Sequence, residues 1–257
     1  MAPVAGLAGK RGLVVGIANE HSLAYGCASA FRDAGAELAV TYLNDHAEPY
    51  VRPLAEGLEA PIILPCDVRN AGELESVFET IARQWGKLDF LLHSIAFAPR
   101  DDLHNGLVDC SAEGFAMAMD VSCHSFIRMA RLALPLMPDG GNMQAVTYYG
   151  AEHVVGHYNL MGPVKAALEA TVRTLAADLA ERGISVHALS SGPVQTRAAS
   201  GIEHFDAILD HVQEATPAHK LVSIEQVGRI SAFLASGAAA PMTGSTVFAD
   251  HGFHIVA

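Results

Sequence analysis

The feature that most restricts the fold of this chain is an alternation of short apolar runs with longer segments in which apolar residues return every three or four positions. The short runs predict buried strands, and the longer segments predict helices with one apolar face. This alternation is typical of a parallel β-sheet with helices on both faces. The expected strands lie at residues 13–15, 38–42, 62–65, 90–93, 143–147, 185–189 and 246–248, and the strongest helices at 71–85, 112–136, 158–181 and 224–235. The sequence therefore predicts an α/β protein with a doubly wound, seven-stranded parallel sheet.

Composition excludes several classes of function. The 257 residues contain no repeat or Pro/Ser-rich linker, so we expect one domain over 1–257. A net charge of −12 opposes attraction to nucleic acids and anionic membranes. No apolar run approaches the roughly 20 residues that span a bilayer, and no secretion signal opens the chain, so we expect a cytoplasmic protein. The four cysteines form no C-x-x-C pair and the thirteen histidines are scattered, so no metal site is expected.

A glycine-bearing turn follows the first strand, between Gly16 and Gly26. A strand, a glycine turn and a helix form the arrangement in which backbone N–H groups bind a pyrophosphate in Rossmann folds. The spacing departs from G-x-G-x-x-G, because Ala18 stands near the middle. An ordinary β-turn with Ser22 as a helix N-cap is the alternative.

Three further segments fit a dinucleotide site. No arginine lies between Arg11 and Arg52, around the end of the second strand, which favours NADH over NADPH. Asp67, after the third strand, could accept a hydrogen bond from an adenine amino group, or it could be a solvated loop residue. Small residues after the fourth strand, at 93–99, would let the chain pass close to a cofactor.

The candidate chemistry lies between residues 147 and 165, where the sequence reads TYYGAEHVVGHYNLMGPVK. Tyr158 and Lys165 are seven residues apart, nearly two helical turns, so in a helix they would share a face. A tyrosine has a pKa of about 10, and a nearby positive charge makes its oxygen a better proton donor or oxyanion partner. A tyrosine that only packs its ring remains the alternative.

With the run SGPVQTRAASGI at residues 191–202, these segments stand in the order found in short-chain dehydrogenases/reductases. The chain resembles, over practically its whole length, the bacterial NADH-dependent enoyl-acyl-carrier-protein reductase family of type II fatty-acid synthesis. Ordinary members of the superfamily carry Tyr-x3-Lys, whereas this chain has Met161 four residues before Lys165 and Tyr158 three residues earlier. The Tyr-x6-Lys spacing marks the enoyl reductase branch.

The resemblance implies a reaction and a role for each residue. Hydride from NADH would reduce the 2,3 double bond of a trans-2-enoyl thioester, Tyr158 would stabilise the enolate oxygen, and Lys165 would bind the nicotinamide ribose. Tyr148 would position the substrate or nicotinamide, with Tyr149 packed behind it. The implied cofactor contacts are Gly16, Ala18, Ser22, Leu23, Asp67, Val68, Ser94, Ile95, Ala96, Lys165, Pro193 and Thr196. The implied substrate contacts are Phe97, Ala98, Leu103, Tyr148, Tyr158, Met161, Ala198, Ala199, Ile202 and Phe205, although the apolar members could equally be core. The family also implies a substrate lid over 196–215 and a homotetramer.

Three departures from the family leave questions open. The lid segment 203–207 is acidic or neutral where the family presents basic residues to an acidic carrier protein, so the thioester carrier could be acyl carrier protein or coenzyme A. His251 stands where the family has glycine. Pro163 lies between Tyr158 and Lys165, and since proline is tolerated only in a first helical turn, a helix should begin close to Tyr158.

Two other functions compete with the enoyl reductase interpretation. A short-chain alcohol dehydrogenase or ketoreductase is the first, and Met161 at the usual tyrosine position argues against it. A non-catalytic NAD-binding regulatory protein is the second; it would need a damaged Tyr/Lys pair, whereas Tyr158 and Lys165 are both present.

Overall fold

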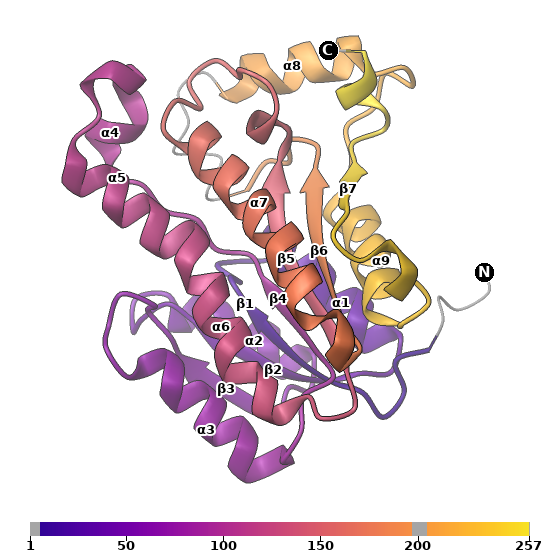
Figure 1. The fold of residues 1–257 in the computed structure, drawn as a ribbon. Coiled ribbons are helices and arrows are strands. Elements are labelled where there is room, and N and C mark those ends of the chain that lie inside the picture. Colours follow the sequence, from indigo (N-terminus) through magenta and orange to yellow (C-terminus); the bar gives the residue numbers. More distant parts are fainter. Residues whose placement is uncertain (1–5, 197–204, 257) are drawn as a thin grey trace.

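The computed structural model, which describes residues 6–196 and 205–256, contains a parallel sheet with the strand order β3-β2-β1-β4-β5-β6-β7 (Figure 1). The strands are β1 Arg11–Val15, β2 Glu37–Tyr42, β3 Ile62–Pro65, β4 Phe90–His93, β5 Gly141–Tyr148, β6 Ile184–Ser191 and β7 Thr246–Ala249. All seven predicted strands are confirmed, with ends that differ by up to two residues. β4, β5 and β6 are apolar or fully buried along most of their length because helices cover both faces.

The helices form two layers, one on each face of the sheet, and each layer packs on the sheet through its own hydrophobic core. Helices α3, α6 and α7 contribute to the core on one face, while α1, α2 and α9 contribute to the core on the other. Helices α4, α5 and α8 extend beyond the carboxyl ends of the strands (Figure 1). The helices are α1 Leu23–Asp33, α2 Glu48–Gly57, α3 Glu73–Trp85, α4 Arg100–His104, α5 Ala112–Met119, α6 Ser125–Ala133, α7 Met161–Leu179, α8 Phe205–Ala215 and α9 Ile224–Ala235.

Two of the predicted helices differ from the observed ones in an informative way. The helix expected over 112–136 is interrupted by a π-helical segment, Asp120–His124, between α5 and α6. The helix expected over 158–181 begins at Met161, so Tyr158 lies in the turn before it. Residues His157 (φ 60°) and Asn159 (φ 34°) have left-handed backbones that a helix cannot contain.

The sheet order places a crevice at its carboxyl edge. The chain runs outward from β1 to β2 and β3, then returns to β4 on the other side of β1. Ligands bind such sheets where the strand order reverses. Among the described residues, no helix is long and apolar enough to cross a membrane, and no group of three His, Cys, Asp or Glu side chains is placed to hold a metal ion.

Candidate active site

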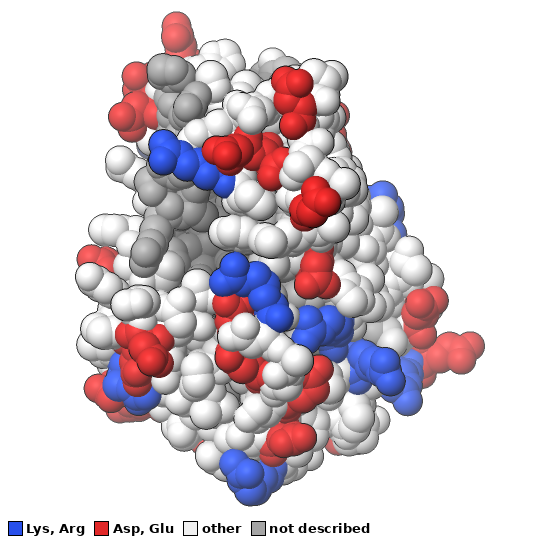
Figure 2. Space-filling view, turned by 90° about the vertical axis from the view of Figure 1, so that its left-hand side faces the viewer, with Lys and Arg blue, Asp and Glu red and all other residues white. Residues whose placement is uncertain are grey.

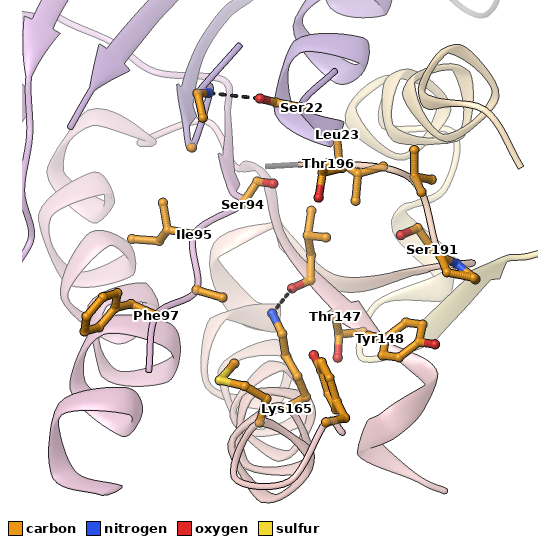
Figure 3. Close-up of a pocket in the computed structure, with 18 of the residues that line it drawn as sticks. Ser22, Leu23, Ser94, Ile95, Phe97, Thr147, Tyr148, Lys165, Ser191 and Thr196 are labelled. Atoms are coloured by element: carbon orange, nitrogen blue, oxygen red, sulfur yellow. Dashed lines mark hydrogen bonds between the residues drawn. The ribbon is translucent and has the colours of Figure 1, made fainter. Parts of the chain in front are cut away.

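A cavity of about 390 Å³ lies at the carboxyl ends of β1, β4, β5 and β6, within the size range of small-molecule sites. Figure 3 shows Ser22 and Leu23 on one side of it and Tyr148 and Lys165 on the other. The lining residues are Gly16, Ala18, Ser22, Leu23, Ser94, Ile95, Ala96, Phe97, Ala98, Leu103, Val146, Thr147, Tyr148, Tyr158, Met161, Lys165, Ser191, Gly192, Pro193, Val194 and Thr196. The structure thus brings together sixteen of the residues that the sequence nominates.

The glycine-bearing turn after β1 forms one end of the cavity. Gly16 has a φ of +123°, and a Cβ there would lie 2.1 Å from the carbonyl oxygen of Ser94, so only glycine fits where the two loops cross. Ser22 Oγ accepts hydrogen bonds from the N–H groups of Ala18 (2.9 Å) and Asn19 (3.0 Å). Ser22 occupies the N-cap position of α1, but its side chain closes the preceding loop instead of capping the helix. The first amides of α1 therefore remain available to an anion.

Tyr158 reaches the cavity from a turn and not from the face of α7. The left-handed residues His157 and Asn159 flank it, and the Asn159 side-chain amide donates to the Leu103 carbonyl at 2.8 Å. Gly150 makes room for the ring, because a Cβ there would lie 2.6 Å from it. The expected shared helical face is wrong, but the expected meeting of Tyr158 and Lys165 in one cavity is correct.

Lys165 lies in the second turn of α7 and is buried, with its ammonium directed at the end of β5. Its Nζ donates to the Val146 carbonyl at 2.7 Å (Figure 3). Burial lowers the pKa of Lys165 to about 8, although the Glu169 carboxylate one turn later opposes this shift. Glu169 is also buried, where it accepts hydrogen bonds from Thr147 (2.8 Å) and Thr246 (3.3 Å).

The tyrosines divide as the sequence predicts. The rings of Tyr148 and Tyr158 meet edge to face with centroids 5.1 Å apart, whereas Tyr149 stacks on His153 and packs against Phe253. Desolvation raises the pKa of Tyr158 far above its ordinary value and that of Tyr148 to about 12. Burial is the main cause of the Tyr158 shift, with Tyr148 and Glu169 adding to it, so the phenol stays protonated as a hydrogen-bond donor.

Two predicted cofactor contacts lie outside the cavity wall. The Asp67 carboxylate accepts from the Arg69 guanidinium at 2.6 Å, which lowers its pKa, and Val68 is buried with its carbonyl bonded to Arg128. The alternative in which Asp67 is a solvated loop residue is wrong, because Asp67 is buried, and its contact with an adenine amino group stays a prediction. Of the predicted substrate contacts, Ala198, Ala199 and Ile202 lie outside the described residues, and Phe205 begins α8.

Five lining residues escaped the sequence analysis: Val146, Thr147, Ser191, Gly192 and Val194. Each lies within two residues of one that was nominated, at the carboxyl ends of β5 and β6. The rule that ligands bind at the carboxyl ends of parallel strands was the signal that could have found them.

Arginine also comes closer to the end of β2 than the sequence suggests. Arg52 returns on α2 to within 5.8 Å of the Tyr42 ring, at the last residue of β2. Its guanidinium pairs with Glu48 at 2.6 Å, so its positive charge is already balanced. The absence of an arginine near the end of β2 is therefore not the right reason to expect NADH, although the pairing with Glu48 leaves Arg52 less able to bind a 2′-phosphate.

The residues present fit a dinucleotide. Small side chains and free helix amides lie at the Gly16 end, where a pyrophosphate could approach the backbone, and a buried ammonium lies at the other end, beside Tyr158. His93, which directly precedes Ser94, is a neutral imidazole because burial lowers its pKa to about 3.

Comparisons with known proteins agree with this geometry. A family model described as enoyl-(acyl carrier protein) reductase matches residues 16–254. An enoyl-[acyl-carrier-protein] reductase [NADH] of Rhizobium meliloti is 45% identical over 257 residues, covering 100% of this chain and 94% of that protein. The corresponding enzyme of Aquifex aeolicus is 45% identical over 252 residues, covering 97% and 93%.

Solved structures show the same architecture. The Bacillus cereus enoyl-acyl carrier protein reductase, solved with NADP+ and indole naphthyridinone, matches with a TM-score of 0.95 at 43% identity over 98% of each chain. The Anaplasma phagocytophilum enzyme, solved with NAD, matches with a TM-score of 0.93 at 43% identity over 97% of this chain and 95% of that one. This chain therefore belongs to the enoyl-(acyl carrier protein) reductase family.

Proposed function

We propose that this protein reduces the 2,3 double bond of a trans-2-enoyl thioester with NADH in type II fatty-acid synthesis. The observation that carries the proposal is the meeting of Tyr158, Lys165 and Met161 in one cavity, with Met161 where a ketoreductase would have its tyrosine. The full-length likeness to reductases named for NADH and acyl carrier protein supports the same substrate and cofactor.

Each side chain has a role that follows from its placement. NADH, when bound, supplies the hydride that adds to the β-carbon of the thioester. Tyr158, a neutral donor held beside the cavity, hydrogen-bonds the thioester oxygen as negative charge develops on it. Lys165 binds the nicotinamide ribose and adds positive charge near that oxygen. Tyr148, edge to face with Tyr158, orients the phenol and the acyl group.

The carrier, the assembly and the location complete the proposal. Acyl carrier protein is the carrier that the family name implies. The lid predicted over 196–215 includes α8, while its residues 197–204 lie outside the described residues. Exposed apolar side chains on α5 and α6, such as Phe115 and Ile127, support contacts between subunits of a cytoplasmic homotetramer. Light scattering of the purified protein measures this assembly directly.

The decisive experiment compares NADH oxidation with enoyl thioesters and with ketones. We expect turnover of crotonyl-CoA and of longer trans-2-enoyl thioesters, on CoA and on acyl carrier protein, and none of simple ketones. Turnover of ketones alone would favour the ketoreductase. NADH binding without any turnover would favour the regulatory protein.

Two substitutions assign the roles. Tyr158→Phe should lower kcat by about a hundredfold, because it removes one oxyanion donor, and should leave the Kd of NADH nearly unchanged. Lys165→Ala should chiefly weaken NADH binding. Tyr50→Phe, at an exposed tyrosine on α2, is the matched control and should behave like the wild type. Full activity in Tyr158→Phe would remove this tyrosine from the mechanism.

A further inference from the structure

Residues 94–98 form a wall of the cavity without regular secondary structure. All five line the cavity, between the end of β4 and the start of α4. An irregular wall needs bonds from elsewhere to keep one shape. Figure 3 shows Phe97 at the far end of this wall from Ser94.

The π-helical segment Asp120–His124 faces this wall. Ser122 lies within the segment, Ser125 is the first residue of α6, and both side chains are 0% exposed. π-helical turns are rare, and they occur frequently at functional sites.

Ser122 binds the outer end of the wall at two points. Its Oγ accepts from the Phe97 N–H at 2.9 Å and donates to the Phe97 carbonyl at 3.2 Å. Buried helical serines often bond only their own helix, at the carbonyl four residues back. Both bonds of Ser122 instead go to Phe97, so they fix the wall and not the helix.

Ser125 binds the inner end of the wall through His93. The Ser125 hydroxyl donates to the Val121 carbonyl at 2.7 Å, so the 2.8 Å contact with His93 Nε2 requires the imidazole to donate. The imidazole therefore carries a proton on Nε2, and its buried Nδ1 has no hydrogen-bond partner among the described residues. His93 immediately precedes Ser94, whose N–H is bonded to Val15 at 2.9 Å.

We propose that Ser122 and Ser125 are positioning residues that hold the two ends of residues 94–98, so that the π-helical segment sets the width of the cavity at Phe97. That the acyl chain occupies the cavity near Phe97 rests on the proposed function. That Ser122 and Ser125 hold residues 94–98 in place does not. Phe97 lines the cavity, and the Arg69 guanidinium lies 5.3 Å from the centroid of its ring.

The test that is independent of catalysis is hydrogen exchange of the unliganded protein. Ser122→Ala should make the amides of residues 94–98 exchange about tenfold faster, because Phe97 loses both of its bonds to Ser122. Ser125→Ala should accelerate exchange at the Ser94 end. The control is Ser231→Ala, which removes a hydroxyl that is equally buried and bonded at 2.6 Å, to Gln144 beneath the other face of the sheet. It should lower thermal stability and leave exchange at 94–98 unchanged.

The kinetic test separates positioning from general loss of stability. Ser122→Ala should raise KM for the enoyl thioester about tenfold, with a smaller change in kcat, and should alter the preference between short and long acyl chains. Ser231→Ala should change neither. The proposal is overturned if Ser122→Ala leaves exchange at 94–98 at the wild-type rate, or if Ser231→Ala shifts exchange and KM to the same extent.

Discussion

Among single residues, Lys165 is a buried cation in the cavity wall whose charge depends on its surroundings. Its pKa of about 8 means that the ammonium loses its proton just above neutral pH. We expect the Kd of NADH to be constant below pH 8 and to rise about tenfold per pH unit above it, because only the ammonium binds the ribose strongly. Fluorescence titration of NADH against pH measures this.

The pH dependence of folding stability should have the opposite sign to that of NADH binding, which provides a check. Because the pKa of Lys165 is lower in the folded protein than in the unfolded chain, this group adds stability as pH rises from about 8 toward its ordinary value. Tyr158→Phe should retain the NADH dependence, since Lys165 remains. A Kd that does not change with pH in the wild type would contradict the assignment of the ribose to Lys165.

Asn159 directly follows Tyr158, has a left-handed backbone and bonds the turn that carries Tyr158 to the Leu103 carbonyl. Asn159→Ala should lower the free energy of unfolding by about 2 kcal/mol, because alanine tolerates the left-handed backbone poorly and the bond to Leu103 is lost. We also expect kcat to fall, because Tyr158 is no longer held. Asn159→Gly restores the backbone but not the bond, so denaturant unfolding and kcat of the two variants separate strain from hydrogen bonding. Equal destabilisation of both would show that the left-handed backbone carries no strain.

At the scale of elements, α7 shows why Pro163 is compatible with the site. The helix begins at Met161, so Pro163 lies in the first turn, where it removes little helical hydrogen bonding. Pro163→Ala should lower the free energy of unfolding by less than about 1 kcal/mol, through a freer unfolded chain, and should leave kcat unchanged.

A contrasting substitution on the same helix tests this explanation. Ala170→Pro, at an exposed position in the interior of α7, should cost about 3 kcal/mol because it removes an internal hydrogen bond. Thermal or denaturant unfolding of both variants decides the point. A large loss of stability in Pro163→Ala would mean that this proline orders the turn at Tyr158.

The same elements show what the sequence could and could not predict. Apolar runs are local, so the strands and the residues at their carboxyl ends were predictable. Pro163 predicted a helix start close to Tyr158, but the separation of Tyr158 from α7 was not predictable, because the left-handed residues before the helix, His157 and Asn159, are not glycines. Residues 120–124 have the pattern of an ordinary helix, so the π-helical segment gave no signal. His251 is a further left-handed residue that is not glycine, with a φ of 55°, in the backbone region that glycine adopts most easily.

At the scale of the whole molecule, the distribution of charge bears on the carrier. Figure 2 shows Lys and Arg in separate small groups with acidic side chains among them. On α8, the exposed carboxylates Asp206, Asp210 and Glu214 recur every four residues and so share one face of the helix. With a net charge of −12, the protein meets an acidic carrier protein with like charge.

This charge predicts a gain of function. The double variant Asp206→Lys/Asp210→Lys should raise kcat/KM for enoyl-acyl-carrier-protein about tenfold at low ionic strength, because it turns repulsion into steering. The gain should shrink near physiological salt, where the screening length is about 8 Å. A neutral enoyl-pantetheine thioester should show no gain.

The variant Asp139→Lys/Asp178→Lys is the control, because it makes the same change in net charge on exposed residues at the opposite edge of the sheet. An equal acceleration in this control would mean that total charge matters and α8 does not, whereas no acceleration in either variant would place the carrier on another surface, such as that around Arg100.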